Sequence, residues 1–169
     1  MVDDRGLFER LCLEAFQSGL SWLTILRKRD GFRAAFAGFE IRRVAAFDER
    51  AVERLLADPQ IVRNRAKVSA AIENARAALR LREDGQSLSE LVWSCRPRRA
   101  VTPRTRSDLP GTTPESVALA GELKRRGFRF VGPTTAYALM QACGIVNDHI
   151  VGCAVRDEVE EERRRVAPL

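Results

Sequence analysis

Apolar residues recur along most of the chain every three or four positions, the spacing of an α-helix that turns one face to a core. Between residues 7 and 29 this spacing is broken once, at Ser18–Gly19, which predicts two helices separated at the glycine. We expect the remaining helices over residues 30–39, 48–57, 64–83, 88–93, 112–126 and 133–143. The alternation of apolar and polar residues that marks a strand is absent. The sequence therefore predicts an all-α fold, and its 169 residues suit one domain over 1–169.

Polar and proline-rich stretches mark where helices begin and where the chain leaves them. Asp48 is placed to cap the helix that follows it, and residues 112–115 (TTPE) have the pattern of a capping box with proline in the first turn. Residues 96–111 are rich in arginine and proline and poor in large apolar side chains, which predicts a mobile surface loop. We expect residues 154–169 to form a charged tail that need not be ordered.

The net charge of the chain is compatible with an anionic partner. The 29 Lys and Arg residues outnumber the 23 Asp and Glu residues, which gives a net charge of +6 and a pI near 9.8. Basic side chains bind nucleic acid by releasing the counterions of its phosphates, although an arginine-rich proteome explains the same composition equally well.

The spacing of the cysteines argues against a disulfide-rich secreted protein, and the length of the apolar runs argues against a membrane-spanning one. The four cysteines are widely spaced and follow no secretory signal, so we expect no disulfide framework and a reducing, cytoplasmic location. No apolar run approaches the roughly 18 to 20 residues that span a membrane, so we expect no membrane partner.

Residues 127–132 (GFRFVG) form a tight connection between two predicted helices, with glycine at both ends and apolar residues inside, as in a helix-hairpin-helix. The N-terminus of the second helix presents backbone N–H groups and a positive dipole, which favour a DNA phosphate. The alternative is a plain helical corner with solvated basic residues. Under the first interpretation the phosphate contacts come from Gly127, Arg129, Val131, Gly132 and Thr134.

Glu14 and Trp22 are the residues most suggestive of a small-molecule pocket. Glu14 follows Leu7 by seven positions and Leu11 by three, which puts a carboxylate on an apolar helix face. A buried acid needs a partner, either an arginine or cap within the protein or a ligand. Trp22 follows the predicted helix break, where its indole either packs in the core or faces a cavity. Together an aromatic face and a carboxylate suit a purine with an exocyclic amine.

His149 and Cys153 have the H-x-x-x-C spacing that places two side chains on one face of a helix. The two residues could supply two zinc ligands. A structural zinc site usually takes four ligands, and the chain has no other histidine, so we expect an unmetallated pair.

Three segments in order resemble the DNA-3-methyladenine glycosylase I family of the helix-hairpin-helix glycosylases. The segments are LFERLCLEAFQSGLSW at 7–22, KRRGFRFVG at 124–132 and LMQACGIVNDHIVGC at 139–153. The resemblance implies a helix-hairpin-helix glycosylase fold over these residues. It also implies that Glu14 is the catalytic, base-contacting residue and that Trp22 helps to form the base pocket.

The reaction that the resemblance implies is hydrolysis of the N-glycosidic bond of 3-methyladenine during base-excision repair. The partner would be double-stranded DNA that contains alkylated adenine, and no cofactor would be required for the chemistry. Many related glycosylases carry a catalytic aspartate at the position of Asn147, but this family does not. Adenine methylated at N3 is already cationic, so its departure needs less activation.

Members of the resembled family usually carry a further N-terminal segment with pocket aromatics and two more zinc ligands. Only residues 1–6 precede the matching part here. The resemblance thus implies half a zinc site at His149 and Cys153, and we expect lower stability and weaker base binding than in a full-length relative. The alternative function is a noncatalytic helix-hairpin-helix DNA-binding remnant, and a helical scaffold for another protein is the third. We expect a monomer.

Overall fold

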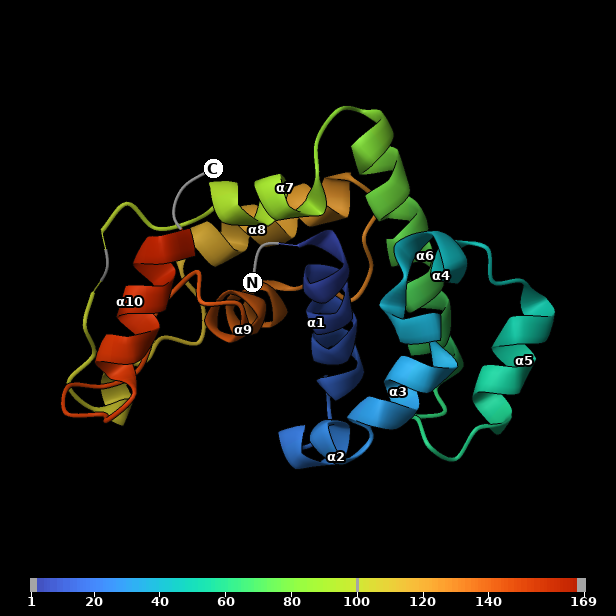
Figure 1. Cartoon of the computed structure of the whole chain (residues 1–169), viewed down its shortest axis with the longest axis horizontal. Coiled ribbons are helices and arrows are strands. Elements are labelled where there is room, and N and C mark those ends of the chain that lie inside the picture. The colour runs from blue at the N-terminus through green and yellow to red at the C-terminus, as the bar shows by residue number, and fades with distance from the viewer. Residues whose placement is uncertain (1–2, 100, 167–169) are drawn as a thin grey trace.

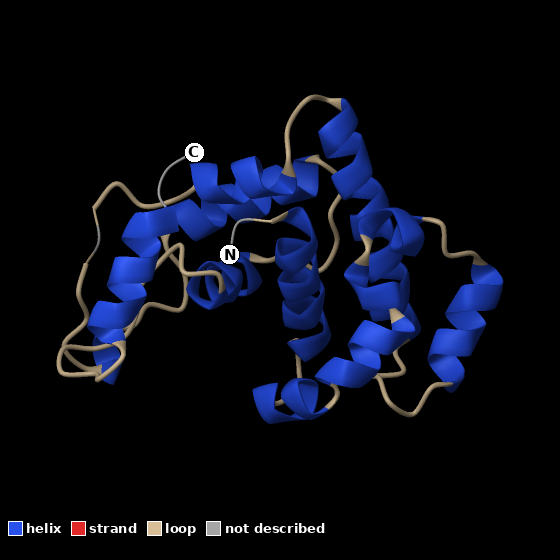
Figure 2. Ribbon diagram, viewed as in Figure 1, coloured by secondary structure: helices blue, strands red, loops and turns tan. Residues whose placement is uncertain are grey.

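The computed structural model describes residues 3–99 and 101–166, and every regular element among them is helical (Figure 2). The elements are α1 (Asp4–Gln17), α2 (Trp22–Arg27), α3 (Arg29–Ala35), the 3₁₀ turn η1 (Ala37–Phe39), α4 (Ile41–Ala45), α5 (Glu49–Ala57), α6 (Arg65–Glu83), α7 (Leu88–Ser94), the 3₁₀ turn η2 (Arg106–Asp108), α8 (Pro114–Arg125), α9 (Pro133–Ala142) and α10 (Arg156–Val166). The prediction of an all-α fold is confirmed.

Helix α1 lies in the middle of the molecule and joins two groups of helices. It packs against α9 and α7 on one side and against α6 and η1 on the other (Figure 1). Because it has neighbours on both sides, α1 is buried over most of its length, including Leu7, Phe8, Leu11 and Phe16. A polar side chain on the buried face of α1 is therefore removed from water.

Phenylalanine side chains fix α1 against α3 and η1. Phe16 packs on Phe32 with ring centroids 4.5 Å apart, and Phe36 stacks on Phe39 at 5.6 Å with the planes 5° apart. All four are fully buried. Burying a phenylalanine stabilises the fold by about 1.5–3 kcal/mol, so this cluster holds the C-terminal part of α1 in place.

Most helix boundaries follow the polar residues that the sequence marks. The side chain of Asp48 caps α5, as expected, and that of Asn64 caps α6. The break after α1 contains Gly19, whose φ of 78° suits glycine. The capping box of α8 is shifted by one residue from the predicted one, because Thr113 caps the helix and Ser116 returns the bond. The short helix α4 was not predicted.

Residues 156–166 form helix α10, where the sequence analysis left a tail that need not be ordered. The reason is Arg163, which is only 6% exposed and docks the helix on the chain that follows α9. Residues 96–99 and 101–111 form a loop, as predicted, but the loop contains η2 and the buried Pro103. The carbonyl of Pro103 accepts a hydrogen bond from the N–H of Val151 at 2.9 Å. In the described part of the chain, no helix is long and apolar enough to cross a membrane.

Candidate functional site

Glu14 lies on the buried face of α1 with only 2% of its surface exposed. Its Oε1 atom is buried and accepts no hydrogen bond from any described residue. Burial raises the pKa of the Glu14 carboxyl to about 7, and the positive charge of Arg10 partly opposes that rise. The structure thus places at the centre of the fold a carboxyl group with one oxygen that none of the described residues satisfies, which is unusual outside functional sites.

Trp22 is the first residue of α2, directly after the break that follows α1. The Ser21 side chain caps α2 by accepting from the N–H of Thr24 at 3.2 Å, and Gln17 Nε2 donates to the carbonyl of Leu20 at 2.6 Å. These local bonds fix the chain between the two helices. Trp22 is half-buried against the core, and α1 and α2 pack together, so Glu14 and Trp22 lie on adjoining helices.

Lys67 on α6 holds the end of α1 in place. Its ammonium group donates to the carbonyl of Phe16 at 2.9 Å and to that of Ser18, and the side chain is only 8% exposed. A cation at a helix C-terminus satisfies carbonyls that have no partner within the helix. Burial lowers the pKa of Lys67. The sequence analysis did not single out this residue, although a lysine one turn before Ala71 on an apolar face was a signal.

The hairpin, residues 127–132, joins α8 to α9. Gly127 has a φ of 88° and ends α8 with a Schellman pair, in which its own N–H donates to Lys124 and that of Phe128 donates to Leu123. Phe128 is buried at the base of the turn. Gly132 precedes α9 with no side chain over the helix end, and a Cβ added there would meet nothing within 4 Å. The first N–H groups of α9 therefore lie open to an approaching anion.

Asn74 on α6 anchors the hairpin to the body of the protein. Its Nδ2 donates to the carbonyl of Arg129 at 3.1 Å, and its Oδ1 accepts from the N–H of the same residue at 2.6 Å. Asn74 is fully buried, whereas the Arg129 side chain is exposed and pairs with Glu73 at 3.1 Å. The turn is thus rigidly held while its basic side chain remains at the surface.

His149 and Cys153 come together, but not in the way that the sequence predicted. The residues lie on either side of a turn at Val151 and Gly152, before α10, and not on one face of a helix. The turn nevertheless brings Cys153 Sγ to 3.4 Å from His149 Nδ1. Among residues 3–99 and 101–166 no group of three or more His, Cys, Asp or Glu side chains could hold a metal ion. The described residues supply two ligand atoms and do not make a zinc site on their own.

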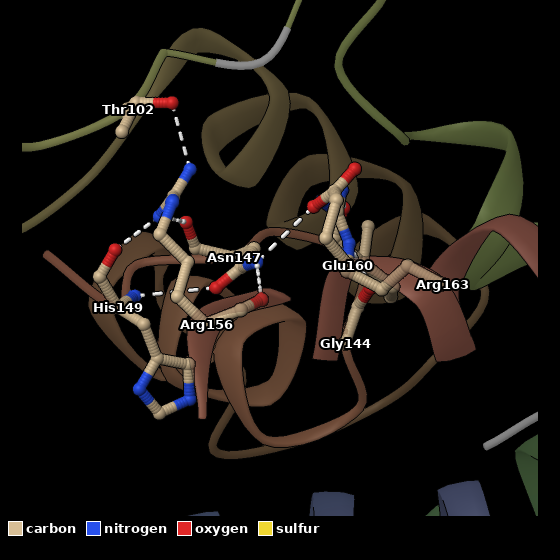
Figure 3. Close-up of polar contacts among 8 residues, drawn as sticks. Thr102, Gly144, Asn147, His149, Arg156, Glu160 and Arg163 are labelled. Carbon is tan, nitrogen blue, oxygen red and sulfur yellow. Dashed lines mark hydrogen bonds and ion pairs between the residues drawn. The ribbon is translucent and has the colours of Figure 1, made fainter. Parts of the chain in front are cut away.

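Asn147 and Asp148 have structural partners in this chain. Asn147 Nδ2 donates to the Arg156 carbonyl and to Glu160 on α10, both at 3.1 Å, and Asn147 Oδ1 accepts from the N–H of His149 (Figure 3). Asp148 accepts from the Tyr137 hydroxyl at 2.7 Å. Burial and this carboxylate raise the pKa of Tyr137 above its usual value. These contacts tie the chain after α9 to its neighbours.

The sequence as a whole identifies the family. Residues 1–157 match the profile described as methyladenine glycosylase. The chain belongs to the methyladenine glycosylase family. The match to this family ends within the first turn of α10, so the contacts of Glu160 and Arg163 lie beyond it.

Two solved structures and one curated relative resemble this methyladenine glycosylase. This chain is 48% identical over 154 residues to DNA-3-methyladenine glycosylase 1 of Escherichia coli (strain K12), across 90% of this chain and 82% of that protein. A crystal structure of 3-methyladenine DNA glycosylase I superposes with a TM-score of 0.88 at 48% identity, covering 91% of this chain and 86% of the other. The structure of a variant of 3-methyladenine DNA glycosylase I in complex with 3-methyladenine superposes with a TM-score of 0.87 at 32% identity. The match covers 92% of this chain and 85% of the other.

A cavity of about 330 Å³ lies away from Glu14 and Trp22 in this methyladenine glycosylase. It is lined by residues of the 96–111 loop and of α8, α9 and α10, with Pro103, Glu115, Tyr137 and Asp148 in its wall. Neither residue that we singled out for base binding lines it. The candidate base site is therefore defined by the buried carboxylate and not by this cavity.

Proposed function

We propose that this chain is a DNA-3-methyladenine glycosylase that hydrolyses the N-glycosidic bond of 3-methyladenine in alkylated DNA during base-excision repair. The observation that carries the proposal is the Glu14 carboxyl, buried in the central helix with an oxygen that has no partner in the part of the chain that the structure describes. Family membership supports it, as does the similarity to a glycosylase whose structure contains 3-methyladenine.

Glu14 recognises the base. In its ionised form the carboxylate accepts a hydrogen bond from the exocyclic amine of adenine, and its negative charge stabilises a base that carries the positive charge of N3-methylation. Trp22, at the start of α2, supplies an aromatic surface on which the flipped base stacks. Because Glu14 is only 2% exposed, the side chains that cover it have to move when the base enters.

The chemical step needs little help from the protein. Water adds through its oxygen to C1′ of the sugar, the electron pair of the C1′–N9 bond leaves with the base, and the water loses a proton to solvent. The cationic base departs as neutral 3-methyladenine and leaves an abasic site. The position at which related enzymes carry an aspartate holds Asn147, whose side chain is engaged with α10 and His149. Selective capture of the base then supplies most of the discrimination.

The hairpin binds the phosphates of the DNA backbone and does not recognise base sequence. Gly132 leaves the start of α9 uncovered, so the N–H groups at Gly132 and Thr134 meet a phosphate where the helix dipole is positive. Gly127 and the buried Val131 shape the turn, and Arg129 contributes positive charge at its surface. Asn74 keeps the turn in position.

We infer that the partner is double-stranded DNA and that the protein acts as a monomer in the cytoplasm. The chemistry described above uses water and the side chains of this chain, so it requires no cofactor. His149 and Cys153 supply at most half of a zinc site from the described residues, and no step of the reaction depends on them.

Release of free 3-methyladenine from methylated duplex DNA tests the proposal. The expected result is a free base and an abasic site, formed without added metal. A chain that binds duplex DNA in a salt-dependent manner but releases no base would instead be a noncatalytic DNA-binding protein.

A further inference from the structure

Two buried polar atoms on α1 have no hydrogen-bond partner among residues 3–99 and 101–166; one is a donor and the other an acceptor. Arg10 Nε carries a hydrogen and can only donate, and Glu14 Oε1 can accept. Among the described residues the remaining side-chain atom of this type is Ser89 Oγ, which belongs to α7. Glu14 follows Arg10 by four positions, so both side chains leave the same face of α1 one turn apart.

Both side chains lie near the same neighbour, at the end of α9. The charge of Arg10 lowers the pKa of the buried Cys143 thiol and that of Glu14 raises it, although burial has the larger effect and raises it overall. Helices α1 and α9 pack directly on each other. Arg10 and Glu14 therefore share one face of α1, and both charges act on Cys143 at the C-terminal end of α9.

A donor beside an acceptor matches the edge of an adenine. The exocyclic amine of adenine donates hydrogen bonds, and the ring nitrogens on either side of it, N1 and N7, accept them. Guanine presents the O6 acceptor at the same place, where it would face the carboxylate of Glu14. A paired acceptor and donor in the protein therefore selects adenine over guanine, because the wrong base leaves buried polar groups unpaired.

We propose that Arg10 is a second base-reading residue, whose Nε–H donates to the ring nitrogen next to the amine that Glu14 binds. The inference rests on the proposed function, because it assumes that Glu14 contacts the excised base. It adds a specificity-determining contact that a carboxylate alone cannot provide. It also explains why a guanidinium and a carboxylate one turn apart each keep an atom without a partner.

Substitutions that separate the hydrogen bond from the charge test this inference. Arg10→Met removes both while keeping a long unbranched stem, and Arg10→Lys keeps the positive charge but places its donors on Nζ, one atom beyond the position of Nε. The affinity of each protein for free 3-methyladenine, 1-deaza-3-methyladenine and 7-deaza-3-methyladenine is measured by calorimetry. Melting temperatures show whether each variant is folded.

The expected result is that both variants bind free 3-methyladenine about tenfold more weakly than the natural chain, the loss of one hydrogen bond. One of the two deaza bases should bind the natural chain about tenfold more weakly as well, and the Arg10 substitutions should have no further effect on that base. Unchanged affinity in Arg10→Met, or a loss of affinity that is the same for all three bases, would overturn the inference.

Release of 3-methyladenine from DNA by the same proteins separates this inference from the proposed function. If the natural chain releases the base and Arg10→Met does so equally fast and with equal preference over 3-methylguanine, only the role of Arg10 is refuted. If the natural chain neither binds nor releases the base, the proposed function is refuted too.

Discussion

Asn74 and Arg129, on α6 and in the hairpin, are joined by two hydrogen bonds between the amide side chain of one and the backbone of the other. Because Asn74 is fully buried, this contact ties the hairpin to the body of the protein.

Asn74→Ala removes both bonds and leaves the Arg129 carbonyl and N–H without these partners. We expect a loss of about 2 kcal/mol in the free energy of unfolding, together with weaker binding to undamaged duplex DNA. Denaturant unfolding and a DNA-binding titration measure the two effects. The control is Glu73→Gln, which breaks only the exposed pair with Arg129 and should cost less than about 1 kcal/mol. Equal effects of the two substitutions would show that Asn74 has no special role.

The two hairpin glycines should respond differently to alanine. Gly132→Ala places a methyl group in open space on an extended backbone, so the fold should be unaffected while the approach of a phosphate is hindered and DNA affinity falls. Gly127→Ala forces a side chain into a φ of 88°, which should cost about 1–2 kcal/mol of stability. Melting temperature and DNA affinity are compared for both. Undiminished DNA affinity in Gly132→Ala would contradict the phosphate contact.

The raised pKa of Glu14 predicts opposite effects of pH on stability and on base release. The protonated carboxyl is favoured in the fold, so its stabilising contribution is present below the ordinary value of 4.5 and is lost as pH rises to about 7. Glu14→Gln should abolish that part of the pH dependence of unfolding. Base release by the natural chain should increase with pH through about 7, because the ionised carboxylate binds the amine and the cationic base. A rate of release that is flat between pH 5 and 8 would count against this assignment.

Arg163 should determine whether α10 stays docked. Its Nε donates to the carbonyl of Gly144 at 2.7 Å and its Nη2 to that of Ile145 at 2.8 Å (Figure 3 draws Arg163 beside Gly144). Arg163→Met removes both donors, which should cost about 1–3 kcal/mol and speed amide hydrogen exchange in α10. Arg165→Met, which breaks an exposed pair with Glu161, is the matched control and should change neither.

Local features of the sequence were sufficient to predict most of the fold. Helix period and capping side chains such as Asp48 and Asn64 act within a few residues, so they can be recognised along the chain. Helix α4 was missed because its five residues are too few to establish a period. Helix α10 was left undetermined because its charged residues suit a solvated tail, and the docking contact of Arg163 reaches back to Gly144.

The candidate site was predictable only where its chemistry shows in one segment. Glu14 was suggested by its place on an apolar face, and the structure finds it buried. Lys67 and Asn74 were not recognised, since their partners lie 51 and 55 positions away and only the folded chain brings them together. The spacing of His149 and Cys153 suggested a helix, whereas a turn brings them together. The roles of Glu14, Trp22 and the hairpin residues in DNA binding and base excision remain predictions.

Single-turnover release of 3-methyladenine from a methylated duplex, by the natural chain and by Glu14→Gln, tests the central claim most directly. We predict that the natural chain releases the base and that Glu14→Gln, which has nearly the same shape but cannot carry the negative charge, loses most of that rate while binding undamaged DNA as before. Release at the same rate by both proteins would contradict the claim that the buried carboxylate recognises the alkylated base.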